Sequence, residues 1–478
     1  MNKLKEALIP IALVLFSFIV KGAYLSFNSI GGDEPFSIFY AQLNVDSIIG
    51  LLSLGNNPPL YEIILHFWID LFGVSPFSVR FPSLIFSSLT VFFIYKLTKN
   101  FFNLKVAIVT CLIFIFSNYQ TVFAHEARVY ALFGMLTTAS MFFYLNIITE
   151  QKKQMRNLII LLLVNVLLIY SHYFGFFILF IQFVFIIVNK SLRVKYWKSL
   201  LICSVVIAFF YLPNVNVIMN RFLESSTNGT WVSPPEGIKS IYNLIRIFSN
   251  APVVASIVIL LLISAMVKYL VKGVGQKVTL VNKFVVFWFV FPLMFTFFIS
   301  YWIPMFLDRY LIFISSVFYM LIAISCDYLF NSKKLRYAIS TIVCVLFIFS
   351  TQPNISNKRN VKETIEKVNE LSRENTSVIY PYNFILNYAY YYDIEMFKGA
   401  DSENDLVKRL KDQNIYGITN ISEINYQGWD HIVYLDAATS FLYPNNGILE
   451  KLNKDYTLIS HSKIYEVFNI YEFAVKKN

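Results

Sequence analysis

Two adjacent carboxylates lie in a glycine-flanked turn soon after the first long apolar segment of the chain. Asp33 and Glu34 directly follow Gly31 and Gly32, and Pro35 comes next. Paired carboxylates on a flexible backbone suit a general base or a ligand for a metal ion. The pattern also suits a helix start, in which an acidic residue caps a helix that Pro35 begins. At the level of the residues both interpretations stay open.

Three further short segments place ionisable or hydrogen-bonding side chains between apolar runs. They are His125-Glu126-Ala127-Arg128, Tyr170-Ser171-His172-Tyr173 and Asp308-Arg309-Tyr310. The guanidinium groups of Arg128 and Arg309 suit bidentate binding of a phosphate, with snorkelling to lipid headgroups as the alternative. His172 either contacts a substrate or satisfies a local hydrogen bond.

The surrounding sequence is that of a membrane protein. Of its 478 residues, 57% are hydrophobic and only 14% are charged. Apolar runs of about 20 residues recur, each long enough to cross a hydrocarbon core as a helix that satisfies its own backbone. The four cysteines lie inside such runs, which argues against a disulfide framework or a cysteine metal site. The net charge of +11 comes mostly from short loops, so we expect no nucleic-acid partner.

The loop charges predict the topology. Lys3 and Lys5 precede the first run, which places the N-terminus in the cytoplasm. Later cationic clusters alternate correctly with about eleven spans if the stretch from Pro58 to Phe72 lies in the interface instead of crossing. The predicted spans lie near residues 8–27, 80–98, 105–122, 128–148, 157–170, 173–189, 199–215, 252–270, 283–302, 310–329 and 336–351. The four polar segments then share the outer face of the cytoplasmic (inner) membrane.

Two domains are predicted. Residues 1–351 form a polytopic α-helical membrane domain, with interfacial helices in the first outer loop at about residues 33–75. Residues 352–478 mix charged and apolar residues and form an extracytoplasmic soluble domain of α/β or α+β type. Its expected strands are 377–380, 431–435 and 471–475, and its expected helices are 361–372 and 405–411.

Several short motifs, in order, resemble a known family. They are Gly32-Asp33-Glu34-Pro35, Asn57-Pro58-Pro59-Leu60-Tyr61, Leu65-His66-Phe67-Trp68, Arg80-Phe81-Pro82-Ser83, Glu126-Ala127-Arg128-Val129-Tyr130 and Asp308-Arg309-Tyr310-Leu311. Together they resemble the bacterial branch of the dolichyl-phosphate-mannose protein mannosyltransferases (glycosyltransferase family 39) and the aminoarabinose transferases, both of the GT-C superfamily. The likeness covers roughly residues 1–330. Each motif alone is weak, whereas their order and spacing are fairly specific.

The resemblance implies a glycosyltransferase that takes a sugar from a polyprenyl-phosphate-linked donor, typically with inversion. It implies that Asp33 is the catalytic base, that Glu34 and Glu126 are further carboxylates of the site, and that Arg128 and Arg309 bind the donor phosphate. We expect the following residues to contact substrate: Asn57, Tyr61, His66, His172, Tyr173 and Tyr310. Asn57 stands where aminoarabinose transferases usually carry a lysine, and its turn also suits a helix start.

No cofactor is expected, and although some GT-C relatives use a divalent cation, we do not favour one here. The expected partners are the donor, a lipid, glycan or protein acceptor, and the bilayer. A transporter or flippase of polyprenyl-linked lipids is the main alternative. Such proteins usually place ionisable groups near the membrane midplane and are built from repeated halves, neither of which this sequence predicts. An inactive scaffold that presents the C-terminal domain is a third alternative.

Overall fold

The structure, a computed structural model, describes residues 3–54, 57–227, 232–272, 279–356, 359–373, 375–465 and 468–476. The chain divides into two compact units. The first comprises Met1–Leu25, Val45–Ile64 and Arg80–Ile355, and the second comprises Ser26–Asn44, Leu65–Val79 and Ser356–Asn478. Two segments of the first loop therefore join the C-terminal region, and composition along the chain gives no sign of this.

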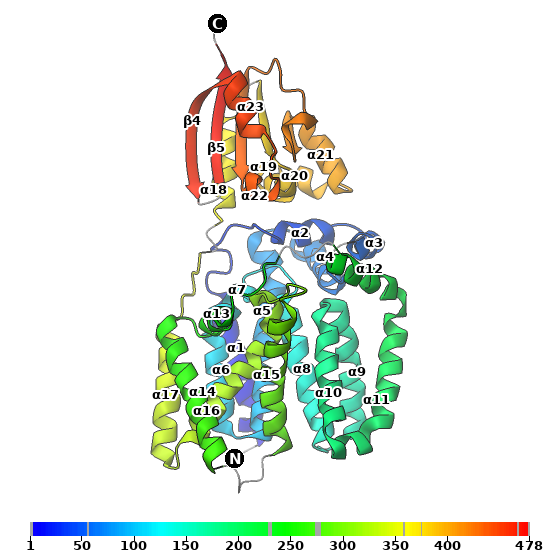
Figure 1. The fold of residues 1–478 in the computed structure, drawn as a ribbon, viewed down its shortest axis with the longest axis vertical. Coiled ribbons are helices and arrows are strands. Elements are labelled where there is room, and N and C mark those ends of the chain that lie inside the picture. The colour runs from blue at the N-terminus through cyan, green and yellow to red at the C-terminus, as the bar shows by residue number, and fades with distance from the viewer. Residues whose placement is uncertain are drawn as a thin grey trace. The chain divides into compact units, whose positions relative to one another are not determined.

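The first unit is a bundle of long helices (Figure 1). Eleven helices coincide with the predicted spans: α1 (Lys3–Gly22), α5 (Pro76–Phe101), α6 (Leu104–Ile115), α8 (Tyr130–Ile148), α9 (Gln154–Ser171), α10 (Phe174–Val188), α11 (Lys190–Tyr211), α14 (Pro252–Lys272), α15 (Leu280–Ile299), α16 (Ile312–Leu329) and α17 (Lys333–Phe349). Seven helices of the described residues are long and apolar enough to cross a membrane, or eight if one bent pair is counted as a span. The fold class is confirmed. The number of candidate spans is below the predicted eleven because helices such as α10, with 15 residues, are short.

Shorter helices connect the long ones. They are α3 (Val45–Leu54), α4 (Leu60–Phe72), α7 (Asn118–Ala124), η1 (Leu212–Asn214), α12 (Val215–Thr227), α13 (Ile238–Phe248) and η3 (Asp308–Leu311). Helix α4 has 13 residues and is therefore about 20 Å long. This length is too short for a hydrocarbon core of about 30 Å, in agreement with the prediction that this stretch does not cross the membrane.

The predicted span 105–122 is bent, which corrects the expectation of one straight helix. Helices α6 and α7 meet at 61°. The interrupted backbone is satisfied by distant side chains: Asn250 Nδ2 donates to the Phe116 carbonyl (2.8 Å) and Asn250 Oδ1 accepts from the Asn118 amide (2.7 Å). Thr351 Oγ1 also donates to the Phe116 carbonyl (2.7 Å). A break inside an apolar span needs hydrogen-bond partners for its backbone. Here the partners come from positions more than 130 residues away.

Helix α16 forms the core of the first unit. It packs against α6, α8, α14, α15 and α17. Nearly every residue from Leu311 to Ala323 is buried, polar Ser315 and Ser316 included. Gln120 of α7 donates to Ser315 (2.7 Å) and Thr138 of α8 to Ser316 (3.1 Å). These bonds fix the helices on either side of the turn that follows α7.

The second unit contains a five-stranded mixed sheet with strand order β2-β1-β3-β5-β4. Its strands are β1 (Thr376–Pro381), β2 (Ile415–Ile418), β3 (His431–Ala437), β4 (Tyr456–Tyr465) and β5 (Phe468–Val475). Strand β1 pairs in parallel with β2 and β3, whereas β5 pairs antiparallel with β3 and β4. The three predicted strands are confirmed as β1, β3 and β5. Two further strands were not predicted: β2, which is short, and β4, which is largely exposed.

Helices surround this sheet. They are α2 (Glu34–Ala41), α18 (Val361–Leu371), η4 (Tyr382–Phe384), α19 (Ile385–Tyr392), α20 (Ile394–Lys398), α21 (Glu403–Lys411), η5 (Ile421–Glu423), α22 (Thr439–Leu442) and α23 (Ile448–Asp455). The predicted helices 361–372 and 405–411 correspond to α18 and α21. Helix α2 comes from the first loop and packs on α19.

Candidate active site

The acidic pair of the first loop lies in the second unit, at the start of α2. Asp33 occupies the N-cap position with an exposed side chain that makes no capping hydrogen bond. Glu34 begins the helix and is 2% exposed. The Asp33 side chain therefore does not cap α2.

Residues from three separate loops of the first unit meet at His172. The imidazole lies in the turn between α9 and α10, is 7% exposed and stacks on Phe133 of α8 with ring centroids 4.8 Å apart. The Tyr310 ring of η3 lies 5.8 Å away. Nδ1 of His172 accepts a hydrogen bond from the Phe174 amide (3.1 Å). Burial, and then the charge of Arg128, lower the pKa of His172 to about 3, so the ring is neutral at physiological pH.

This shift predicts an acid-dependent loss of stability. The unfolded His172 binds a proton near pH 6.5, whereas the folded one does not until about pH 3. The unfolded state therefore takes up more protons as the pH falls from about 6.5 towards 3, which destabilises the fold. We expect His172→Gln to flatten the dependence of Tm on pH in this range, measured by thermal unfolding in detergent. An unchanged pH dependence would show that His172 is not held neutral.

Arg128 is buried, at 5% exposure, in the turn between α7 and α8. Its backbone carbonyl accepts a hydrogen bond from Ser83 Oγ (3.4 Å), and Ser83 Oγ in turn lies 3.0 Å from Tyr61 Oη. Tyr61 is completely buried, so the structure places it as a support of this turn. Glu126, in the same turn, is half-buried, and its carbonyl accepts from the Arg128 amide (2.8 Å).

The Asp308-Arg309-Tyr310 segment forms η3. Tyr119 of α7 donates to the Asp308 carbonyl (2.6 Å), while Asp308 Oδ1 accepts from the Arg309 amide (2.8 Å). Arg309 is half-buried, and the Tyr310 ring stacks on Phe174 with centroids 5.5 Å apart. The bend between α6 and α7 therefore positions two elements at once: the Arg128 turn that follows α7, and η3 through Tyr119.

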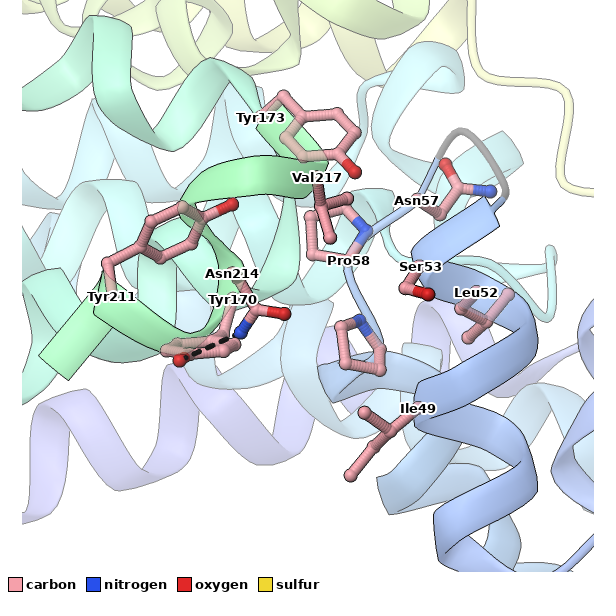
Figure 2. A pocket seen from close by; sticks show the side chains of 11 residues that line it. Ile49, Leu52, Ser53, Asn57, Pro58, Tyr170, Tyr173, Tyr211, Asn214 and Val217 are labelled. Carbon is pink, nitrogen blue, oxygen red and sulfur yellow. Dashed lines mark hydrogen bonds between the residues drawn. The ribbon is translucent and has the colours of Figure 1, made fainter. Parts of the chain in front are cut away.

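Asn57 and Tyr173 line one small crevice. Figure 2 shows them with Pro58, Tyr211 and Asn214. These residues come from the loop between α3 and α4, the α9–α10 turn, the end of α11 and η1. The cavity measures about 10 Å³, which is room for a single water molecule. Its wall is fixed because Asn214 Nδ2 donates to Tyr170 Oη (3.0 Å) and that hydroxyl donates to the Phe210 carbonyl (2.8 Å).

His66 belongs to the second unit. Its Nδ1 is 2.8 Å from the Ala41 carbonyl, at the end of α2, and its Nε2 is 3.8 Å from Asp70 one turn along α4. The ring therefore connects α4 to α2.

Lys21 is a buried cation that was not among the predicted site residues. It lies near the end of α1, fully buried, with Nζ 2.9 Å from Ser87 Oγ and 4.1 Å from the centroid of the Phe114 ring. Its carbonyl lies 2.5 Å from Nε2 of His125, next to Glu126. A lysine near the end of an apolar run just before the Asp33 turn was a usable signal. Tyr119, Ser83 and Asn250 could not be singled out from the sequence, because residues of these types occur throughout the chain.

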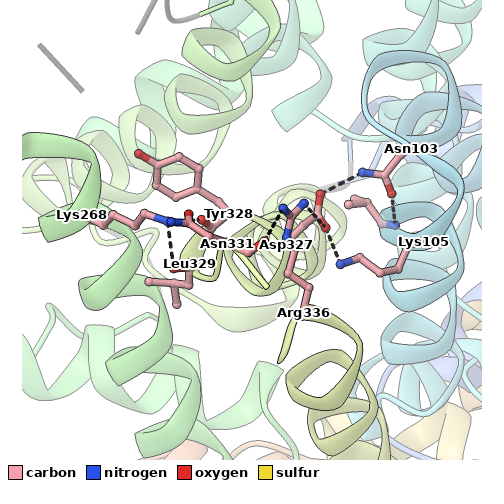
Figure 3. Close-up of polar contacts among 9 residues, drawn as sticks. Asn103, Lys105, Lys268, Asp327, Tyr328, Leu329, Asn331 and Arg336 are labelled. Atoms are coloured by element: carbon pink, nitrogen blue, oxygen red, sulfur yellow. Dashed lines mark hydrogen bonds and ion pairs between the residues drawn. The ribbon is translucent and has the colours of Figure 1, made fainter. Parts of the chain in front are cut away.

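The opposite ends of the helices carry a structural ion cluster (Figure 3). Asp327, near the end of α16, pairs with Lys105 at the start of α6, accepts from Asn103 Nδ2 (2.9 Å) and lies 3.8 Å from Arg336. Lys268 of α14 donates to the last two carbonyls of α16, at 2.7 and 2.9 Å. A cation at a helix C-terminus also complements the helix dipole.

We expect Asp327→Asn to lower the free energy of unfolding by about 1–3 kcal/mol, because it weakens charged hydrogen bonds at a partly buried carboxylate. Thermal or denaturant unfolding in detergent measures this loss. Glu236→Gln is the matched control, because it breaks the Lys239 pair between side chains that are 71% and 69% exposed. Equal effects of both changes would show that the Asp327 cluster contributes no more than a surface ion pair.

Metal-ligand geometry is not evident in the described part of the chain. Among those residues, no three His, Cys, Asp or Glu side chains gather closely enough to hold an ion. That the reaction uses no divalent cation stays a prediction.

The fold defines a class: a multi-pass helical membrane protein that also carries a small sheet domain. Residues 56–216, about a third of the chain, match the family model of the dolichyl-phosphate-mannose-protein mannosyltransferases. None of the curated proteins gives a significant match.

Solved structures agree in fold. ArnT from Cupriavidus metallidurans superimposes with a TM-score of 0.61 in its apo state and 0.62 when bound to undecaprenyl phosphate, at 10% identity. These matches cover 97% and 98% of both chains, respectively. The archaeal oligosaccharyltransferase AglB from Archaeoglobus fulgidus, in complex with an inhibitory peptide and a dolichol-phosphate, superimposes with a TM-score of 0.55 at 10% identity. This match covers 100% of this chain and 75% of the AglB chain. The resemblance predicted from the motifs is confirmed.

Proposed function

We propose that this protein is a glycosyltransferase that moves a sugar from a polyprenyl-phosphate-linked donor to a lipid, glycan or protein acceptor. The observation that supports this most is the cluster in which Arg128, His172 and Tyr310 come together from three loops. The related folds of ArnT and AglB, solved with undecaprenyl phosphate and a dolichol-phosphate, support the donor class. The family match supports sugar transfer.

In the proposed reaction, Asp33 takes the proton of an acceptor hydroxyl or amine as that atom attacks the anomeric carbon of the donor sugar. The bond between this carbon and the phosphate oxygen breaks, and its electron pair leaves with the polyprenyl phosphate. Arg128 and Arg309 stabilise the charge that develops on the leaving group. Attack opposite the leaving phosphate inverts the anomeric carbon.

The distribution of charge supports an outer-face location. The Arg128 turn, the His172 turn and η3 join helices at one end of the bundle, while the Lys105, Lys268 and Asp327 cluster joins them at the other. Cationic loops usually face the cytoplasm. We therefore place the reaction on the non-cytoplasmic side of the inner membrane, with the N-terminus in the cytoplasm.

The test is to incubate the purified full chain with polyprenyl-phosphate sugars and measure the release of free polyprenyl phosphate. An enzyme releases it, and more so when the acceptor is supplied. Movement of intact donor across vesicle membranes without release would show a flippase instead. Comparing the envelope lipids and surface glycans of cells with and without the protein identifies the acceptor.

A further inference from the structure

The Gly31–Gly32 turn, which precedes Asp33, leaves little room for a side chain at either position. Gly32 has φ +63°, a left-handed conformation that side chains disfavour. A Cβ on Gly31 would lie 2.7 Å from Val361 Cγ2, and one on Gly32 would overlap the Arg359 guanidinium. Both neighbours belong to the start of the C-terminal region. The two glycines therefore allow this region to approach the turn closely.

Two side chains of the C-terminal region hold the carbonyls of this turn. Arg359 Nη1 donates to the Gly31 carbonyl (2.9 Å), and Asn387 Nδ2 of α19 donates to the Gly32 carbonyl (3.1 Å). Asn387 is only 6% exposed. A buried hydrogen bond of this kind orients a backbone strongly, because an unpaired partner is costly.

The helix that follows Asp33 is held by the same region. Phe39 of α2 packs edge-on against Phe397 of α20, with centroids 5.4 Å apart, and Tyr40 Oη donates to Glu403 Oε1 of α21 (2.8 Å). Burial, together with the Glu403 carboxylate, raises the pKa of Tyr40, so its hydroxyl stays a donor. The Asp33 side chain, between the turn and α2, is exposed and does not cap the helix.

We propose that the C-terminal domain sets the position of Asp33, with Arg359 and Asn387 as positioning residues that fix the turn through its two carbonyls. This inference rests on the proposed function, because it assigns Asp33 the role of base. It gives the domain a part in the reaction that requires no substrate contact. Misplacing a catalytic group by about 1 Å can cost about 100-fold in rate.

The first test is Asn387→Asp in the full chain, which keeps the side-chain shape but replaces the donating amide with an oxygen that repels the Gly32 carbonyl. We expect kcat to fall about 10- to 100-fold while KM for the donor stays nearly constant. Asn446→Asp is the matched control. Asn446 is 8% exposed and donates to the Tyr443 carbonyl (3.0 Å) in the same domain, away from the turn. Equal losses of kcat in both variants would overturn the proposal.

A second test uses Arg359→Ala with added guanidinium. If the guanidinium group positions the turn, free guanidinium restores part of kcat in this variant. It restores nothing in Arg409→Ala, which removes a surface pair with Asp405. Absence of rescue together with an unchanged kcat in Arg359→Ala would overturn the role of Arg359.

Hydrogen exchange separates this inference from the proposed function. We expect the amides of residues 31–34 to exchange faster in Asn387→Asp than in Asn446→Asp, whatever reaction the protein performs. Unchanged exchange would show that the turn is not held, which overturns the inference alone. Faster exchange combined with full activity of an Asp33→Asn variant would instead overturn Asp33 as the base, and with it the positioning role.

Discussion

Asp33→Asn is expected to lower the rate of sugar transfer by about 10²- to 10⁴-fold, the usual contribution of a general base. The change keeps the shape of the side chain and removes only its capacity to accept a proton. Asparagine is as good a helix cap as aspartate, and the Asp33 side chain makes no capping bond. Helix α2 should therefore form normally. Release of polyprenyl phosphate from the donor, measured as a single turnover, reports the loss.

The matched control is Asp46→Asn. Asp46 is exposed in the first turn of α3, within the same first loop, and has no proposed role. We expect this variant to retain full activity and both variants to unfold at the same temperature as the unchanged protein. Normal turnover by Asp33→Asn would remove Asp33 from the mechanism. In that case Glu34 or Glu126 would be the next carboxylate to test.

Arg128→Gln is expected to lower transfer by about 10²- to 10³-fold, similar to the loss of one donor that stabilises a developing anion. The transfer rate of Arg128→Lys should lie between those of Arg128→Gln and the unchanged protein, because lysine keeps the charge but not the bidentate fork. Inhibition by free polyprenyl phosphate should weaken in the same order. Ser83 binds the backbone carbonyl of Arg128 and not its side chain, so the turn keeps this support in both variants.

Arg246→Gln is the control for a change of charge alone. Arg246 lies in the last turn of α13, on the predicted outer side, and has no role in the proposed mechanism. It should leave both transfer and product inhibition unchanged. An independent readout is the pKa of His172, which should rise in Arg128→Gln because a nearby cation is lost. Arg128→Gln with normal inhibition by polyprenyl phosphate would show that Arg128 does not bind the donor phosphate.

The sequence alone determined the membrane character of the first unit and the class of fold. Runs of about 20 apolar residues allow few alternatives to spanning helices, since lipid offers the backbone no hydrogen bonds. The strands β1, β3 and β5 were predictable because each contains a short run rich in β-branched and aromatic residues. Weak motifs in a specific order indicated the resemblance to a family, and the family model later matched residues 56–216.

The tertiary structure alone decided how the polar segments are arranged. The bend after α6 depends on Asn250 and Thr351, and the His172 cluster depends on which turns become neighbours. Sequence also gave no sign that Arg359 and Asn387 reach the Gly31–Gly32 turn from more than 300 residues away. Local composition determines whether a segment forms a helix or a strand and whether it is buried, because these properties depend mainly on the residues of the segment itself. Contacts between distant segments follow only from how the helices pack, and composition along the chain does not record that packing.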